Sequence, residues 1–322
     1  MALKVGMVSL GCCKNQVDAE IMLSLVKQAG FELCTEPGLC DVVIINTCGF
    51  IEDAKRESIE NILEFCQLKK EGQIKAVVVT GCLAERYREE IASEIPEADV
   101  ILGIGSNEKI VSAIKKAVAG EKVVLFGEKN ELPLNGDRII SNLPFYAYLK
   151  LADGCDNFCT YCAIPYIRGR YRSRKIEDVM KEAEHLAKHG VKELVLVAQD
   201  TTRYGEDLYG KSVLPELLDR LQKLDGLKWI RMLYCYPDKI TDELIAAINR
   251  NDKVLPYLDV PVQHISTPIL KAMNRRDTEE TLRALFAKLR REIPGVVLRT
   301  TLIAGFPGET EAEFEDTISL IE

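Results

Sequence analysis

Several features are missing from this 322-residue sequence, and each absence excludes a class of protein. No apolar run approaches the roughly 18 residues that a membrane-spanning helix needs. The N-terminal stretch MALKVGMVSLG is typical of a first buried strand rather than of a secretory signal. No GxxxxGK(S/T) or GxGxxG stretch occurs, so nothing indicates a nucleoside triphosphate or dinucleotide site. We therefore expect a cytoplasmic protein with no membrane partner.

Basic charge is also scarce. The chain has 42 Lys and Arg residues against 50 Asp and Glu residues, a net charge of −8. Tight nucleic-acid binding depends on basic side chains that neutralise phosphates, so a basic partner suits this chain better. Cysteine, in contrast, is plentiful, with 11 residues. In a chain without a secretory signal, this number favours metal binding or redox chemistry over a disulfide framework.

The first 125 residues alternate short apolar runs with amphipathic stretches. Buried parallel strands are predicted at 3–10, 41–47, 75–81 and 98–103, with helices at 15–30, 52–70, 84–95 and 107–119. This alternation predicts an α/β domain built on a doubly wound parallel sheet. Residues 127–145 are rich in Gly, Pro, Asn and Asp, and they are the predicted linker.

The alternation resumes after the linker. Strands are predicted at 146–154, 192–200, 228–236, 257–264 and 296–306, each followed by helical sequence. Five strand–helix units form a partial (β/α) barrel, whose functional residues belong at the C-terminal ends of the strands. The predicted organisation is therefore a first domain at 1–126, the linker at 127–145 and the partial barrel at 146–322. Because the sequence stops inside its last predicted helix, we expect a truncated barrel.

Three cysteines lie within the nine residues GCDNFCTYC, directly after the first predicted barrel strand. They are Cys155, Cys159 and Cys162. A structural zinc site needs four ligands, and the His185 and His189 pair on the next helix is an alternative source of one, although solvated helix residues explain that pair more simply. A cluster of four irons held by three thiolates leaves one iron open to a small molecule. We predict an iron–sulfur site.

The CxxxCxxC spacing after the first strand of a partial barrel, with Tyr161 between the last two cysteines, resembles the radical S-adenosylmethionine (SAM) superfamily. The resemblance implies that SAM binds the open iron and is cleaved to a 5′-deoxyadenosyl radical. It also implies that Tyr161, Gln263, Arg299 and Gly305 bind the cofactor.

Each of these positions has a plainer alternative. Gly305 could form a simple turn, and Arg299 could pair with a neighbouring acid. His264, next to Gln263, could be a structural histidine. Gln199 and Asp200, at the end of the second predicted barrel strand, are weaker cofactor-binding candidates of the same kind.

Three more cysteines lie just past predicted strand ends in the first domain. They are Cys12, Cys48 and Cys82, separated by 36 and 34 residues. The C-terminal ends of parallel strands share one edge of a sheet, so these thiols are expected to converge there. Any one of these cysteines, taken alone, would be interpreted as a buried core residue. Their repeated position predicts a second cluster.

The stretches SLGCCKNQVDAE, CAIPYIRGRYRSR and VAQDTTRYGEDLYG resemble the methylthiotransferases that modify an aspartate of ribosomal protein S12. This resemblance implies two 4Fe-4S clusters, and transfer of a methylthio group to the aspartate β-carbon. It implies ribosomal protein S12, free or on the small subunit, and an electron donor as partners. The alternative is the branch of the family that acts on tRNA adenosine.

Two details depart from a simple family match. Cys13 stands where relatives often have proline, and the motif assigns Cys12 as the ligand and Cys13 as a bystander. The family's C-terminal TRAM module is absent from this chain, so we expect part of the substrate recognition to be missing, and whether this fragment is active stays open. The stretch RGRYRSR (168–174) is expected to be a solvated loop with some arginines near the cofactor carboxylate, and contact with ribosomal RNA stays open.

Overall fold

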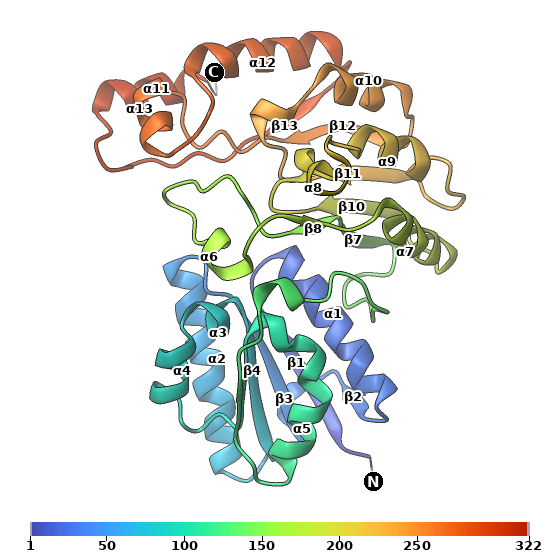
Figure 1. Ribbon diagram of the computed structural model, residues 1–322, viewed down its shortest axis with the longest axis vertical. Helices are drawn as coiled ribbons and strands as arrows, with labels where there is room; N and C mark the ends of the chain where they lie inside the picture. The colour runs from blue at the N-terminus through green and yellow to red at the C-terminus, as the bar shows by residue number, and fades with distance from the viewer. Residues whose placement is uncertain (1, 321–322) are drawn as a thin grey trace. The chain divides into compact units, whose positions relative to one another are not determined.

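A computed structural model describes residues 2–320 of the chain (Figure 1). Its contacts divide the chain into two compact units. Unit 1 comprises Met1–Ser141 and Ala163–Arg170, and unit 2 comprises Asn142–Cys162 and Tyr171–Glu322. The domain and linker boundaries expected from composition stay a prediction. None of the helices between residues 2 and 320 is long and apolar enough to cross a membrane.

Unit 1 contains a six-stranded parallel sheet with the order β2-β1-β3-β4-β5-β6. The strands are β1 (Lys4–Ser9), β2 (Glu32–Cys34), β3 (Val42–Thr47), β4 (Ala76–Gly81), β5 (Val100–Leu102) and β6 (Val123–Leu125). The four predicted strands are confirmed. The two edge strands, β2 and β6, were not predicted. They have only three residues each and are partly exposed, so neither provides a long buried apolar run.

Helices cover both faces of this sheet. They are α1 (Cys13–Gln28), α2 (Glu52–Lys70), α3 (Cys82–Arg86), α4 (Arg88–Glu94) and α5 (Ile110–Val118). The 3-10 turns are η1 (Pro37–Leu39), η2 (Ile104–Lys109) and η3 (Lys129–Glu131), and the short helix α6 (Ile164–Arg168) packs against α3 and η3. Along β3, Val43 and Ile45 enter the core under α2, α3 and α4, whereas Val42 and Ile44 enter the core under α1 and α5 (Figure 1). A strand buried on both faces reads as a continuous apolar run, which explains its sequence.

The single helix predicted at 84–95 is wrong in one respect. The structure has two short helices, α3 and α4, separated by Tyr87, which has φ −121° and ψ 50°. These angles lie outside the helical region, so the helix axis breaks there. The helix predicted at 52–70 is confirmed as α2.

Unit 2 contains a five-stranded parallel sheet with the order β13-β12-β11-β10-β7, and a small antiparallel pair, β8 with β9. The strands are β7 (Tyr146–Lys150), β8 (Ala152–Asp153), β9 (Arg172–Ser173), β10 (Glu193–Val197), β11 (Trp229–Met232), β12 (Val254–Asp259) and β13 (Val297–Arg299). The helices are α7 (Ile176–Lys188), α8 (Glu206–Tyr209), α9 (Leu214–Leu221), α10 (Asp242–Arg250), α11 (Thr267–Ala272), α12 (Glu279–Glu292) and α13 (Glu311–Ile318), with 3-10 turns η4 (Thr201–Arg203) and η5 (Pro237–Lys239). This strand–helix alternation confirms the predicted partial barrel.

The end of the fourth barrel strand was predicted wrongly. β12 ends at Asp259, so Gln263 and His264 lie beyond it. Pro261 has no N–H to donate to a neighbouring strand, and Gln263 takes a left-handed φ of 71°. Gln263 makes only an isolated parallel bridge with Leu302.

Candidate functional site

The barrel cysteines, Cys155, Cys159 and Cys162, lie on the loop 154–162 that follows β8. The end of α11 fixes this barrel cysteine loop. The side chain of Asn274 donates to the carbonyl of Phe158 at 2.9 Å, and the Thr160 N–H donates to the carbonyl of Met273 at 3.1 Å. Phe158 has φ 50°, a strained value for a side chain of this size, so the loop is held in a specific conformation.

The barrel thiols act on one another electrostatically. Burial raises the pKa of Cys155 to about 12; the backbone N–H of Asn157 opposes this rise, and the charges of Asp200, Cys162 and Cys159 add to it. A buried thiol of this kind loses its proton readily only to a bound cation, as thiolate ligands of metals do. Three thiols on one braced loop fit an iron–sulfur cluster.

Two residues that the sequence did not single out line the barrel cysteine loop. The hydroxyl of Tyr236 lies 3.8 Å from the Cys159 sulfur, and the Arg275 guanidinium lies 4.0 Å from the centre of the Tyr236 ring. Burial and the charge of Cys159 raise the pKa of Tyr161, and Arg275 opposes that rise. Tyr161 therefore lies near Cys159 and Arg275, and its contact with the cofactor stays a prediction. Tyr236 follows β11, and its place after a barrel strand was the available signal.

An unsatisfied polar atom lies at the end of the second barrel strand. Gln199 donates through its side-chain nitrogen to Asp153 at 2.8 Å, and Asp153 pairs with the buried Lys150 at 3.1 Å. Among the described residues, the buried Gln199 oxygen Oε1 has no hydrogen-bond partner. Buried acceptors are nearly always satisfied, so a donor from a bound molecule would complete this site. The arrangement fits a polar cofactor at the mouth of the barrel.

Asp200, the neighbour of Gln199, is committed to the protein. Burial raises the pKa of its carboxyl, against hydrogen bonds from Thr202 and Asn157. Asn157, on the barrel cysteine loop, donates to it at 2.9 Å, and Arg203 donates to the same oxygen at 2.9 Å. The Asp200 carboxylate therefore holds the barrel cysteine loop in place, and its oxygens already accept hydrogen bonds from protein side chains.

The other candidate cofactor residues lie at the end of β13 or beyond β12 and β13. Arg299 pairs with Asp259 at 3.1 Å, which is the neighbouring-acid alternative. Gly305 has φ 77°, and its N–H donates to the Glu309 carboxylate. His264 is fully buried, lies 3.1 Å from the Glu309 carboxylate and accepts from the Ser266 N–H at 2.9 Å, as a structural histidine does. Contact of Gln263, Arg299 and Gly305 with SAM stays a prediction.

The strand-end cysteines, Cys12, Cys48 and Cys82, follow β1, β3 and β4, which are neighbours in the sheet of unit 1. Burial raises the pKa of Cys82 to about 11, with Arg168 lowering it and the charges of Cys12 and Cys48 raising it. Burial likewise raises the pKa of Cys48, and the charge of Cys12 adds to this rise. The three thiols thus follow neighbouring strands of the sheet and affect one another's pKa values, and their role as cluster ligands stays a prediction.

Gly11 allows the segment that carries Cys12 to lie close to Cys48. Gly11 has φ 89°, and a Cβ atom added to it would lie 2.7 Å from the Cys48 Cβ and 2.9 Å from the Cys48 sulfur. A side chain at this position would therefore push Cys48 away from Cys12.

The strand-end site is positively polarised. Desolvation raises the pKa of Cys12, but the charges of Lys14 and Arg168 and the backbone N–H groups of Asn15 and Lys14 outweigh it, so the pKa is lowered. A lowered thiol pKa favours the thiolate that binds metal. Together, these three thiols and the cations beside them fit a second iron–sulfur cluster.

The arginine-rich stretch 168–174 was not predicted correctly as a solvated loop. Arg168 is buried in unit 1, where it donates to Asp18 at 2.8 Å and to the Cys82 sulfur at 3.4 Å. Arg174 is buried in unit 2 and pairs with Glu182 at 2.6 Å. Hydrogen-bonded acids compensate both guanidiniums, so burial of these charges is tolerated.

The other five cysteines differ in their burial. Cys40, Cys66 and Cys235 are buried, and Cys34 is partly buried, as predicted. Cys13 is half-buried in the first turn of α1. Across residues 2–320, no three His, Cys, Asp or Glu side chains are arranged to hold one metal ion. In a four-iron cluster, each thiolate binds a different iron, so its ligands need not meet at one point.

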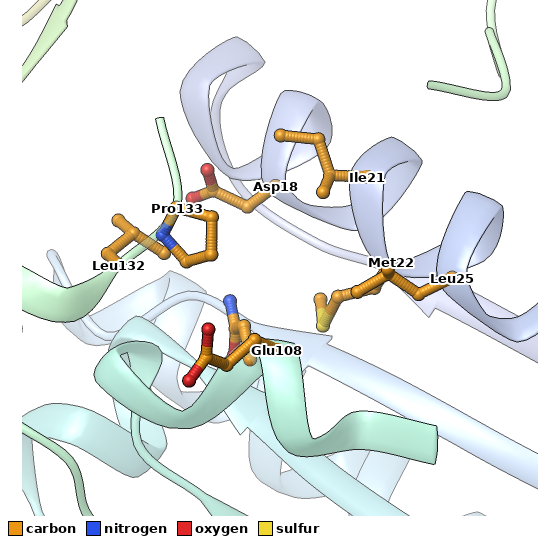
Figure 2. Close-up of a pocket in the computed structure, with 8 residues that line it drawn as sticks. Asp18, Ile21, Met22, Leu25, Glu108, Leu132 and Pro133 are labelled. Carbon is orange, nitrogen blue, oxygen red and sulfur yellow. The ribbon is translucent and has the colours of Figure 1, made fainter. Parts of the chain in front are cut away.

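A pocket in unit 1 contains no cysteine (Figure 2). Asp18, Ile21, Met22 and Leu25 of α1 line one side, and the opposite side is lined by Glu108, Leu132 and Pro133. Asn107 also lines the pocket. Its walls are mainly apolar, and its Asp18 carboxylate is the partner of Arg168. This pocket belongs to neither group of cysteines.

Comparison with known proteins places these features in a family. Residues 4–103 match the family model described as uncharacterized protein family UPF0004, and residues 149–321 match the radical SAM superfamily. The radical SAM superfamily implies a 4Fe-4S cluster and SAM, and the N-terminal domain suggests a second cluster.

Curated relatives are similar over nearly the whole chain. The ribosomal protein uS12 methylthiotransferase RimO of Thermoanaerobacter sp. (strain X514) is 51% identical over 97% of this chain and 71% of its own length. The proteins of the same name from Clostridium tetani and Clostridioides difficile are 49% and 51% identical, each over 99% of this chain and 72% of their own length.

Solved structures share the fold at low sequence identity. The radical SAM methyltransferase TsrM of Kitasatospora setae matches with a TM-score of 0.71 and 16% identity, over 100% of this chain and 73% of that one. The cobalamin-dependent SAM radical enzyme OxsB matches with a TM-score of 0.68 and 16% identity, over 100% and 52%. These likenesses concern the fold alone. The two family matches and the identity to curated relatives confirm the resemblance found in the sequence motifs, and the chain belongs to the radical SAM methylthiotransferases, in the group of the ribosomal protein uS12 methylthiotransferases.

Proposed function

We propose that this chain transfers a methylthio group to the β-carbon of an aspartate of ribosomal protein S12, using SAM and two 4Fe-4S clusters. The observation that supports this most is the identity of about half of all residues to uS12 methylthiotransferases, over 97–99% of the chain. We assign the second cluster to residues 1–126 and the SAM-binding cluster to residues 146–322.

The reaction requires chemistry that side chains cannot supply. The β-carbon of an aspartate lies beside a carboxylate and is not acidic, and general acid–base catalysis contributes only about 10²–10⁴-fold. When bound, the barrel cluster and SAM supply a 5′-deoxyadenosyl radical able to take a hydrogen atom from such a carbon. The chain's own residues bind and orient these groups.

In the barrel, Cys155, Cys159 and Cys162 hold the cluster on a loop that Asn274 and Asp200 brace. The unpaired side-chain oxygen of Gln199 would accept a hydrogen bond from the cofactor. The predicted contacts of Tyr161, Gln263, Arg299 and Gly305 complete the cofactor site. Fixing these groups in advance lowers the entropic cost of aligning the radical with its target.

In unit 1, Cys12, Cys48 and Cys82 would hold the second cluster, whose chemistry when bound is sulfur transfer. The thiols lie at the ends of neighbouring strands, and Lys14 and Arg168 polarise them. The activity is assigned to the cytoplasm, where an electron donor reduces the clusters. The acidic chain, at net charge −8, suits a ribosomal protein, which carries basic residues to bind RNA.

The test compares two substrates. The reconstituted protein is incubated under anaerobic conditions with reductant, SAM and either ribosomal protein S12 or tRNA. Mass spectrometry of peptides and nucleosides then locates an added methylthio group. Modification of an S12 aspartate is the expected result. A product on tRNA adenosine alone would overturn the assignment to the protein-modifying group.

A further inference from the structure

Arg168 occupies a position that the cofactor chemistry does not explain. It ends α6, six residues after the barrel cysteine Cys162, yet the segment 163–170 belongs to unit 1. Its side chain is 1% exposed, although arginine is almost never fully buried unless it is paired. Something in unit 1 therefore requires a cation at this point.

The Arg168 guanidinium contacts Cys82 directly, and through Asn15 it is linked to the backbone that leads into Cys12 and Cys48. One terminal nitrogen donates to Asp18 at 2.8 Å, and the other lies 3.4 Å from the Cys82 sulfur and 3.2 Å from the Asn15 side-chain oxygen. The amide nitrogen of Asn15 donates in turn to the carbonyls of Leu10, at 2.8 Å, and Thr47, at 3.2 Å.

These carbonyls belong to the chain segments that lead into Cys12 and Cys48. Asn46 adds a further hydrogen bond to the backbone of Asn15 at 2.8 Å. Arg168 is therefore at the centre of a hydrogen-bond network beneath the three thiols. The planar fork of arginine, with donors pointing two ways, suits this position, whereas the single ammonium of lysine does not.

We propose that Arg168 is a positioning residue that sets the reduction potential of the strand-end cluster, and this proposal depends on the second cluster of the proposed function. Three thiolates make such a cluster negatively charged, and reduction adds one more negative charge. A buried charge needs compensation by a cation or by hydrogen bonds. Hydrogen bonds to the ligating sulfur and nearby charge are the means by which a protein tunes an iron–sulfur potential. Loss of Arg168 disfavours the reduced state and lowers the potential.

The test isolates the strand-end cluster in the full chain. Replacing the three barrel cysteines by Ala leaves one cluster, whose midpoint potential is measured by redox titration followed by electron paramagnetic resonance. In this background, Arg168→Gln is expected to reduce the ratio of reduced to oxidised cluster about tenfold at a fixed applied potential, a shift of about 59 mV for a one-electron couple. Arg168→Lys keeps the charge but loses the fork, and an intermediate shift is expected.

Arg138 supplies a matched control. Its guanidinium is equally enclosed, with a side chain 4% exposed, and it pairs with Glu20 of the same helix α1 at 2.6 Å. Arg138→Gln is expected to lower the melting temperature without changing the midpoint potential. This comparison separates the loss of a buried ion pair from an effect on the cluster.

The outcomes are distinct. An unchanged potential in Arg168→Gln, with iron content equal to that of the parent, overturns the role of Arg168 alone. If Arg168→Gln does not retain iron, Arg168→Lys decides: a lowered potential at full iron content supports the role, and an unchanged one overturns it. If the parent with intact Arg168 holds no four-iron cluster, the two-cluster function fails, and the role of Arg168 fails with it.

Discussion

Replacing Gly11 by Ala tests whether the close approach of two chain segments positions the strand-end cysteines. Gly11 has φ 89°, and its new Cβ would lie 2.7 Å from the Cβ of Cys48 and 2.9 Å from its sulfur. Contacts below 3.0 Å cannot persist, so Cys48 must move. The left-handed backbone alone costs an alanine about 1–3 kcal/mol.

Gly120 separates these two effects. It also lies in unit 1, with φ 87°, but a Cβ there would meet nothing within 4 Å. Gly120→Ala therefore carries the backbone cost without the collision. For a protein of this size, each kcal/mol lowers the melting temperature by about 2–4 °C, so we expect Gly120→Ala to melt several degrees lower. Gly11→Ala is expected to melt lower still.

The decisive assay is iron content after anaerobic reconstitution, with the barrel cysteines replaced by Ala. The parent is expected to hold about four irons, and Gly120→Ala the same number. Gly11→Ala is expected to lose most of them because Cys48 no longer lies in place. If Gly11→Ala keeps the full iron content and melts at the same temperature as Gly120→Ala, the close approach does not position Cys48.

Three further predictions concern the clusters and the charges of unit 1. Replacing the barrel cysteines by Ala should remove about half of roughly eight irons and all cleavage of SAM, as measured by 5′-deoxyadenosine release, and retained cleavage would contradict the site. Replacing the strand-end cysteines by Ala should preserve SAM cleavage but abolish methylthio transfer to S12, and transfer by that variant would show that sulfur comes from elsewhere. Lys75 and the Lys4 N–H each lie 2.8 Å from the Asp41 carboxylate and lower the pKa of Asp41 in the folded state. The contribution of Asp41 to stability is therefore present above its unfolded pKa of about 3.9, and it is lost as pH falls through the lower folded pKa. We expect this loss to be below about 1 kcal/mol and absent from Asp41→Asn, as measured by urea unfolding from pH 5 to pH 2; an equal loss in that variant would assign the pH dependence to other groups.

The sequence predicted those parts of the fold that local pattern determines. β3 reads as an unbroken apolar run because Val43 and Ile45 enter one core and Val42 and Ile44 the other. The grouping of the strand-end cysteines also followed from pattern, because parallel strands end at the same edge of their sheet. The edge strands β2 and β6 have only three residues each, too few for a clear pattern, and no local signal marks the break at Tyr87, so these features were missed.

The parts that depend on long-range contacts could not be read from the sequence. Four arginines in seven residues indicate a solvated basic loop, because nothing local reveals that Asp18, 150 residues earlier, buries Arg168. Tyr236 and Arg275 likewise meet the barrel cysteine loop only after the chain has folded. Spacing finds ligands that share one segment or one sheet edge. It does not find the residues that surround them.

The assignment of residues 163–170 to unit 1 affects how this protein can be dissected. A recombinant piece that stops at Ser141 would include every strand of the first sheet but would lack α6, which lies against α3 and η3. Asp18 and Asn15 would then face solvent or collapse inward, and Cys82 would have no guanidinium beside it. Sequence order and spatial order differ at this point, so a recombinant form of unit 1 must also include α6, joined to it by a linker.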